Sequence, residues 1–266
     1  MAVSSKRMRI SLNPEAEVIG VSSLILVALS VLATSFISGV FGMAGGMVLI
    51  GILLLLLDVA PAMILFGVTQ TASNGWRCLL WRHHIRWDIF WRYALGSVLM
   101  FVGFRFIAFL PDKIMIYLGM GLMPFLVEAL PLHWQPHIER RGAPVFCGAL
   151  VMACQLLAGA AGNILDLFFN KSDLDRKAIV ATKAATQTLA HILRVLYFGS
   201  LSMEALAELP WWIHLGCIGL AFTGTTAATR VLNAMSDTNF KKWSRVIILT
   251  VSAIYILRGI VLAFYG

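Results

Sequence analysis

Hydrophobic residues in this chain form long continuous blocks instead of the alternating or one-sided patterns of soluble proteins. Eight blocks approach the roughly 20 residues needed to cross a hydrocarbon layer of about 30 Å. They lie at about 18–41, 62–80, 90–110, 113–130, 144–161, 177–199, 210–232 and 243–264, and two shorter blocks lie at 46–57 and 162–169. Continuous runs without strict alternation are typical of helices and not of a barrel. The pattern predicts an all-α integral membrane fold with about eight spans plus two short segments.

Composition agrees with this prediction and limits the classes of binding partner that we expect. The chain is 59% hydrophobic and 13% charged, whereas soluble domains carry roughly 25% charged residues. Its net charge of +8 comes from residues at the ends of spans and in short loops, such as Lys6, Arg7, Lys241 and Lys242. Basic residues in these places anchor a protein to anionic lipid and set its topology. We therefore expect the lipid bilayer as a partner and no nucleic acid.

Two halves of the chain repeat the same order of elements. Thr69-Gln70-Thr71 with Arg77 and Thr186-Gln187-Thr188 with Arg194 are related by one offset of 117 residues. Glycine-containing elements, Gly42–Gly46 and Gly159–Asn163, precede them, with an offset of 116 from Gly46 to Gly162, so a gap of one residue aligns both. The repeat predicts an N-terminal cytoplasmic tail at 1–17, membrane repeats at 18–130 and 144–266, and a linker at 131–143. If each half crosses the membrane an odd number of times, the two halves have inverted orientations. The substrate site is then expected near the midplane of the bilayer, where broken helices meet.

Charge in the loops leaves the orientation open. If all ten segments cross the membrane, both termini are cytoplasmic and the loop at 81–89 lies outside. Together with the adjoining span ends, that loop is strongly basic through Arg77, Arg82, Arg86 and Arg92, which conflicts with the preference of basic loops for the cytoplasm. Re-entrant short segments would change the number of crossings.

The glycine elements have two interpretations. Small residues allow close helix packing in a membrane. Alternatively, the helix breaks there, and backbone N–H groups at Gly45, Gly46, Gly162 and Asn163 face an anion at the positive end of a short helix. The second interpretation is favoured, because both halves place the element before a segment too short to span the membrane.

A polar stripe follows the glycine element in each half. The stripe in 177–199 consists of Lys183, Gln187, His191 and Arg194, which fall within about 80° on a helix. The corresponding positions in the first half are Phe66, Gln70, Asn74 and Arg77. Because polar groups facing lipid are costly, the two stripes should face each other or a water-filled cavity.

These polar residues each allow a structural and a functional role. Gln70 and Gln187, with Asn74, either join helices or donate hydrogen bonds to a ligand. Lys183 either binds an anion or pairs with Asp166, and Asp166 or His191 could carry a coupling proton. Arg77 and Arg194 either snorkel as anchors or act in gating. Donors and cations with few carboxylates suit a small anion.

The glycine element followed by Ala181-Thr182-Lys183-Ala184-Ala185-Thr186-Gln187 resembles the TauE/SafE family of sulfite exporters. These are small bacterial membrane permeases with two homologous halves. The usual Gly-x-Gly-Gly-Gly appears here as Gly42-Met43-Ala44-Gly45-Gly46, and Gly51 stands where the family has proline. The resemblance implies a bacterial inner-membrane location and the transport of sulfite, a sulfonate such as sulfoacetate, or a related small organic anion.

We accordingly expect a secondary transporter that works by alternating access, with a proton or sodium gradient as its drive and no cofactor. A passive anion channel and a membrane subunit of a larger complex are the alternatives, and a homo-oligomer is compatible with each. No enzyme is expected, because H-E-x-x-H and G-x-S-x-G motifs are absent from the sequence. His83/His84 and His133/His137 lie in expected loops without a partner carboxylate at metal spacing, so we expect neither a catalytic nor a metal site.

Overall fold

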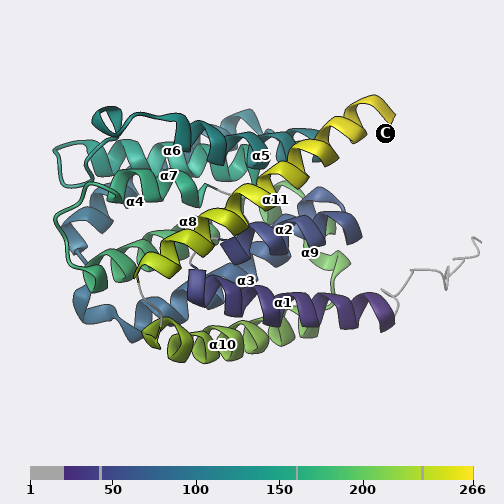
Figure 1. The fold of residues 1–266 in the computed structure, drawn as a ribbon. Coiled ribbons are helices and arrows are strands. Elements are labelled where there is room, and N and C mark those ends of the chain that lie inside the picture. The colour runs from purple at the N-terminus through teal and green to yellow at the C-terminus, as the bar shows by residue number, and fades with distance from the viewer. Residues whose placement is uncertain (1–20, 42–43, 160, 235–236, 266) are drawn as a thin grey trace, which may run out of the picture.

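A computed structural model describes residues 21–41, 44–159, 161–234 and 237–265, and every regular element in them is helical (Figure 1). The long helices are α1 (Val21–Phe41), α3 (Val59–Leu80), α4 (Trp87–Ile107), α5 (Lys113–Ala129), α6 (Ala143–Ala158), α8 (Arg176–Leu201), α10 (Trp211–Ala234) and α11 (Asp237–Tyr265). The short helices are α2 (Ala44–Leu56), α7 (Gly162–Phe169) and α9 (Met203–Glu208), and the 3-10 turns are η1 (Arg82–His84) and η2 (Leu132–Trp134).

The hydrophobic blocks of the sequence became helices close to their predicted positions. Each long block matches one long helix, and the two short blocks match α2 and α7, whereas α9 was not predicted. Within the described residues, three helices are both long and apolar enough to cross a membrane, namely Ser22–Phe41, Trp87–Ile107 and Lys242–Tyr265. The chain is therefore a helical membrane protein, and the count of eight spans stays a prediction. The predicted N-terminal tail at 1–17 lies outside the described residues.

The outer faces of the bundle are apolar. Large side chains such as Trp91, Leu99, Leu126 and Phe106, which is 87% exposed, point away from the core. Contiguous apolar surface of this kind is unfavourable in water but not in lipid. The surface pattern thus agrees with the apolar composition of the chain.

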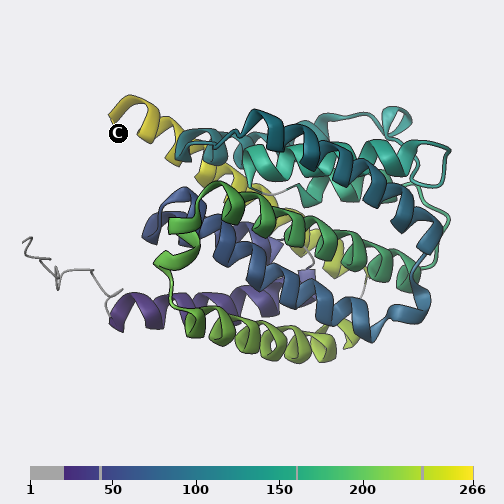
Figure 2. The same ribbon diagram turned by 180° about the vertical axis from the view of Figure 1, so that it is seen from behind.

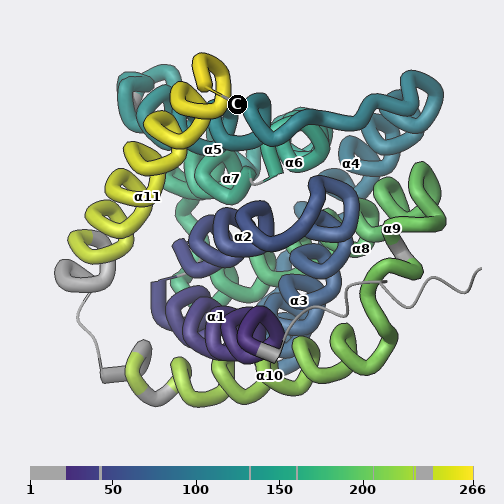
Figure 3. The backbone as a smooth tube through the Cα atoms, turned by 90° about the vertical axis from the view of Figure 1, so that its right-hand side faces the viewer, coloured from purple at the N-terminus to yellow at the C-terminus, as the bar shows by residue number. Residues whose placement is uncertain are grey.

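Helices from the two halves pack against each other in pairs. α3 and α8 lie against one another at the centre, α1 packs along α10, α4 along α6, and α5 along α11 (Figures 1 and 3). Glycine permits the closest of these approaches, because a Cβ atom on Gly96 would overlap the backbone of Val145, and one on Gly148 would overlap the backbone of Tyr93. The central α2 contributes Leu49, Ile50 and Leu53 to the main core (see Figure 3).

The described residues of each glycine element lie where one helix ends or at the start of the next. α1 ends at Phe41, and α2 begins at Ala44 and runs back along α1. In the second half, α6 ends at Ala158, Gly159 has φ of 78°, a left-handed conformation that favours glycine, and α7 begins at Gly162. Met43 and Ala160 lie outside the described residues. Each half therefore contains a helical hairpin, α1–α2 or α6–α7, and the two hairpins touch where Asn163 Nδ2 lies 3.9 Å from Met47 Sδ.

The two ends of the bundle differ in charge. The first residue of α1 and the last of α11 lie at one end, while the α3–α4 connection and the start of α8 lie at the other (Figures 1 and 2). The second end, here called the basic end, carries Arg82, Arg86, Arg92, Arg140, Arg141, Lys171, Arg176, Lys177, Lys242 and Arg245 against Asp88, Glu128, Glu139, Asp173 and Asp175. The end with the termini carries Arg105, Lys113 and Arg258 against Asp58, Asp112, Glu204 and Glu208.

Candidate functional site

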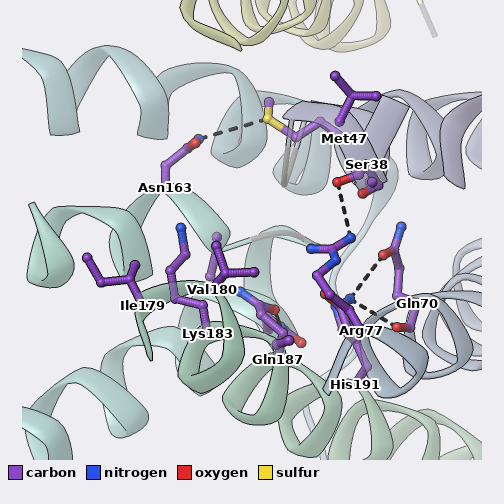
Figure 4. A pocket seen from close by; sticks show the side chains of 18 of the residues that line it. Ser38, Met47, Gln70, Arg77, Asn163, Ile179, Val180, Lys183, Gln187 and His191 are labelled. Carbon is purple, nitrogen blue, oxygen red and sulfur yellow. Dashed lines mark hydrogen bonds between the residues drawn. The ribbon is translucent and has the colours of Figure 1, made fainter. Parts of the chain in front are cut away.

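A cavity of about 440 Å³ lies between α3, α8 and the tips of the two helical hairpins (Figure 4). This volume is within the range of about 300–1,000 Å³ that is usual for ligand pockets. Its lining comes from both halves of the chain. The described lining residues are Ser38, Gly39, Val40, Gly46, Met47, Phe66, Gln70, Asn74, Arg77, Met120, Met123, Gln155, Ala161, Gly162, Asn163, Leu174, Arg176, Ile179, Val180, Lys183, Ala184, Gln187 and His191.

Most of the residues singled out from the sequence line this cavity. They are Gly46, Gln70, Asn74, Arg77, Gly162, Asn163, Lys183, Gln187 and His191. Gly45, Asp166 and Arg194 do not belong to its lining. A Cβ atom on Gly45 would overlap the backbone of Thr34 and Ser38, so this glycine serves the close packing of α2 on α1. The packing interpretation thus applies to Gly45, whereas anion binding at Gly46, which lines the cavity, stays a prediction.

Gln70 is held so that its amide nitrogen is free. The side chain is only 3% exposed, and Asn74 Nδ2 donates to Gln70 Oε1 at 3.3 Å and to its backbone oxygen at 3.0 Å. Gln70 Nε2 has no partner within the described part of the chain. A Cβ atom on Gly46 would lie 3.1 Å from this nitrogen, so glycine at that position keeps the space beside the amide open.

Gln187, the counterpart of Gln70, has the same arrangement with a different neighbour. It is 7% exposed, and Gln155 Nε2 donates to Gln187 Oε1 at 3.2 Å. Gln187 Nε2 likewise lacks a partner among the described residues. In each glutamine an adjacent amide occupies the oxygen, so the nitrogen is the group left for a ligand. A buried donor without a partner costs free energy, and a bound acceptor would remove that cost.

Gln155 was not singled out from the sequence. It lies on α6, four residues before Gly159, and lines the cavity beside Gln187. A glutamine inside an otherwise apolar block was the signal that could have identified it. Its counterpart at the offset of 117 is Ser38, which also lines the cavity.

Arg77 and Arg194 make the same contact in the two halves. Arg77 donates to the backbone oxygen of Ser38 at 3.1 Å, and Arg194 donates to that of Gln155 at 3.1 Å, each across 39 residues of sequence. The carbonyl groups in the last turn of a helix lack helical partners and carry partial negative charge. Both arginines therefore stabilise the end of a helix that stops inside the protein.

The surroundings of the two arginines differ. Arg77 lines the cavity, whereas Arg194 is 0% exposed, donates also to the oxygen of Gly159, and lies 4.8 Å from the centroid of the Phe66 ring. Arg194 is therefore enclosed by protein and does not snorkel toward a membrane surface. The cavity approaches the basic end of the bundle at Arg77 and is closed toward Arg194.

Lys183 and His191 lie on the α8 side of the cavity. Lys183 Nζ forms an ion pair with Asp166 of α7. The His191 ring lies edge-on to Phe66, with centroids 5.4 Å apart, and its Nδ1 has no partner within the described residues. Lys183 thus has a counter-charge inside the protein, as one of the two interpretations of this residue required.

A family comparison decides which proteins the chain is related to. The family model described as "Sulfite exporter TauE/SafE" matches residues 26–256, which include both hairpins, both polar stripes and the cavity. The chain belongs to the TauE/SafE family. Members of this family are transporters, which agrees with the expectation that the chain is not an enzyme. No curated protein and no solved structure gives a significant match.

One expectation about loop histidines was wrong for this TauE/SafE chain. His137 does have carboxylate neighbours, because its Nδ1 lies 3.8 Å from Glu139 and its Nε2 lies 3.8 Å from Asp173. Glu139 also lies 3.7 Å from Arg86 and accepts a hydrogen bond from the backbone nitrogen of Asp173 at 3.1 Å. Sequence spacing concealed this cluster, since the two carboxylates come from different loops. Its contacts join the linker to the α7–α8 loop.

Proposed function

We propose that this chain is a secondary transporter that moves a small sulfur-containing or organic anion, such as sulfite or a sulfonate, across the bacterial inner membrane by alternating access. The observation that carries the proposal is the pair of buried glutamines, Gln70 and Gln187. They occupy equivalent positions in the two halves and line one cavity, and both amide nitrogens lack a partner among the described residues. Sulfite and sulfonate groups present several oxygen acceptors, so they match NH₂ groups that lack an acceptor.

Charges around the cavity support an anion. Arg77, Arg176 and Lys183 are among the described lining residues, and no aspartate or glutamate is among them. Asp166 stands behind Lys183 as its ion-pair partner. Membrane interiors penalise unbalanced charge strongly. An anion bound beside Arg77 would bring a negative charge into a lining that has no described carboxylate.

Packing in the bundle supports inverted repeats. In the order of elements, α1 corresponds to α6, α3 to α8, α4 to α10 and α5 to α11. When corresponding helices are exchanged, the α1–α10 pair becomes the α6–α4 pair, and the α3–α8 and α5–α11 pairs stay the same. The contacts of Arg77 and Arg194 are exchanged in the same way. In transporters with inverted repeats, the two halves exchange conformations as the site opens alternately to each side. The open Arg77 side and the closed Arg194 side would thus be exchanged in the other state.

Replacing one member of the Lys183–Asp166 pair should destabilise the protein more than replacing both. Asp166→Asn leaves the ammonium of Lys183 without its counter-charge. Because the side chains of Lys183 and Asp166 are 25% and 37% exposed, we expect a cost below the roughly 3–5 kcal/mol of a fully buried pair. We expect lower melting temperatures in detergent for Asp166→Asn and for Lys183→Met, and recovery in the double variant. A stable Lys183→Met variant that binds no anion would instead make Lys183 a direct ligand, which is the other interpretation that the sequence allows.

We propose further that the basic end faces the cytoplasm, because short loops rich in lysine and arginine remain on that side. The start of α1 and the end of α11 would then lie outside, opposite to the orientation suggested by the N-terminal charges. Single cysteines at Ser172 and at Glu204, in a variant lacking the native cysteines, should report this in intact cells. Glu204→Cys should react with an impermeant maleimide and Ser172→Cys should not, and the reverse labelling would refute the orientation.

Ligand binding tests the proposed function directly. Purified protein should gain thermal stability with sulfite, sulfoacetate or a related anion, because a ligand that binds only the folded state raises its stability. Sulfate, thiosulfate and small carboxylates are tested in the same way, so that the gain in thermal stability ranks the anions. Chloride at equal ionic strength is the control. The proposal fails if no anion in this set stabilises the protein beyond chloride. Coupling to protons would make uptake depend on a pH gradient, and His191→Gln should remove that dependence.

A further inference from the structure

A second, smaller cavity adjoins the first at the basic end of the bundle. It has a volume of about 200 Å³ and shares Gly39, Arg77, Arg176 and Val180 with the larger cavity. Its other described lining residues are Trp81, Lys177, Thr225 and Thr229. The space therefore lies between the C-terminal end of α3, the N-terminal end of α8 and the last turns of α10. We call it the vestibule.

Cations dominate the lining of the vestibule. Arg77, Arg176 and Lys177 contribute to its wall, and the described wall contains no carboxylate. The nearest acidic neighbour along the chain, Asp175, is the N-cap of α8 and accepts from the backbone nitrogen of Ala178 at 2.6 Å. The charged groups of the described wall are therefore all basic.

The side chains of Arg77 and Lys177 are fixed by groups other than an anion. Arg77 is oriented by its hydrogen bond to the Ser38 oxygen. Lys177 Nζ lies 5.7 Å from the centroid of the Trp81 ring, a cation–π contact that holds the ammonium at the vestibule. An ammonium carries three N–H donors, and those that point away from the ring stay available for an oxyanion. Arg77 belongs to both walls and so joins the vestibule to the cavity that contains Gln70 and Gln187.

We propose that the vestibule is an outer anion-binding site, where Arg77 and Lys177 hold one small oxyanion before it passes to the glutamine pair. This site rests on the proposed transport function and adds a second binding step on the basic side alone. A charged funnel raises the local concentration of an oppositely charged solute and speeds its capture. Among the described residues, the end of the bundle with the start of α1 and the end of α11 has no comparable excess of basic residues, so the effect should be one-sided.

Lys177→Met tests the site through the sidedness of transport. In proteoliposomes sorted by orientation, the initial rate of sulfite exchange is measured with the substrate added to either end. We expect the KM to rise about five- to tenfold when sulfite is added to the basic end, which corresponds to roughly 1–1.4 kcal/mol, with the other KM and both maximal rates unchanged. An unchanged KM at the basic end, or an equal rise at both ends, would overturn the proposal.

Two controls distinguish anion capture in the vestibule from a general loss of surface charge and from lipid binding. Lys242→Met removes the same charge at the basic end, from an exposed position outside the vestibule, and should leave both KM values unaltered. A lipid phosphate could also occupy a basic pocket at a membrane surface. A shift in KM of equal size in zwitterionic and in anionic membranes supports capture of the dissolved anion, whereas a shift seen only with anionic lipid assigns the pocket to lipid and overturns the proposal.

Failure of the vestibule and failure of the transport function give different results. A wild-type protein that exchanges sulfite and related anions with saturation, together with a Lys177→Met variant that is indistinguishable from it, refutes the vestibule alone. A wild-type protein that exchanges none of these anions refutes both. Because Lys177 is exposed, the variant should keep the wild-type melting temperature, which confirms that any change in KM comes from the site.

Discussion

Replacing Gln70 or Gln187 by leucine should weaken anion binding by roughly 5- to 150-fold each. Each substitution removes a buried amide whose nitrogen has no partner in the described part of the chain. The loss of one partner from a buried hydrogen bond costs about 1–3 kcal/mol, where 1.4 kcal/mol corresponds to a factor of ten. Gln70→Glu should weaken binding further, because it keeps the size of the side chain but replaces the donor by a charge of the same sign as the ligand. Thermal shift titration with the best anion measures all three affinities.

The matched control is a glutamine outside the cavity. Gln135 lies in the linker, where it donates to the oxygen of Leu130 at 3.3 Å, and Gln135→Leu should leave the affinity unchanged. If Gln70→Leu and Gln187→Leu are folded and bind the anion as tightly as the wild type, the two amides act only in helix packing. That result would remove the main support for the proposed site.

Arg194→Met should cause the largest loss of stability among substitutions at the ends of the broken helices. Arg194 is fully buried and is the donor to two backbone oxygens, those of Gln155 and Gly159. Each buried carbonyl left without a donor costs roughly 1–3 kcal/mol. The cation also balances the negative end of α6, and methionine cannot replace it. We expect a lower melting temperature and a lower yield of folded protein.

Arg77→Met is the internal control for this prediction. Arg77 makes the equivalent contact with Ser38 but borders the cavity, where water can reach the carbonyl that the arginine leaves. Its replacement should therefore lower the melting temperature much less than Arg194→Met does. Equal melting temperatures for the two variants would mean that the different burial of the arginines has no energetic consequence, and the one-sided opening of the cavity would lose its support.

Periodic features of the sequence predicted the helices and the two polar walls of the cavity. Long apolar blocks placed the helices, since span length and composition are local properties. The stripe of Lys183, Gln187 and His191 identified one wall of the cavity, because residues three and four apart share a face of a helix. The stripe through Gln70 and Asn74 identified the wall opposite.

Contacts between distant segments could not be predicted in this way. The direction in which Gly45 faces depends on how α2 packs on α1, and the role of Gln155 depends on its distance from α8. The gap of one residue between the halves was also unnecessary, because Gly45 and Gly162 are 117 residues apart, as are Gln70 and Gln187. An ungapped alignment would have paired Ser38 with Gln155 and drawn attention to both.

Sulfite counterflow in proteoliposomes tests the central claim most directly. Vesicles are loaded with unlabelled sulfite, diluted into labelled sulfite, and followed over time, with sulfoacetate tested in parallel. The account predicts that wild-type protein accumulates label transiently above its equilibrium level, as only a carrier that exchanges substrate across the membrane can, and that the folded Gln70→Leu/Gln187→Leu double variant does not. Label that only equilibrates in wild-type vesicles, as through a channel, or an overshoot that persists in the double variant would contradict it.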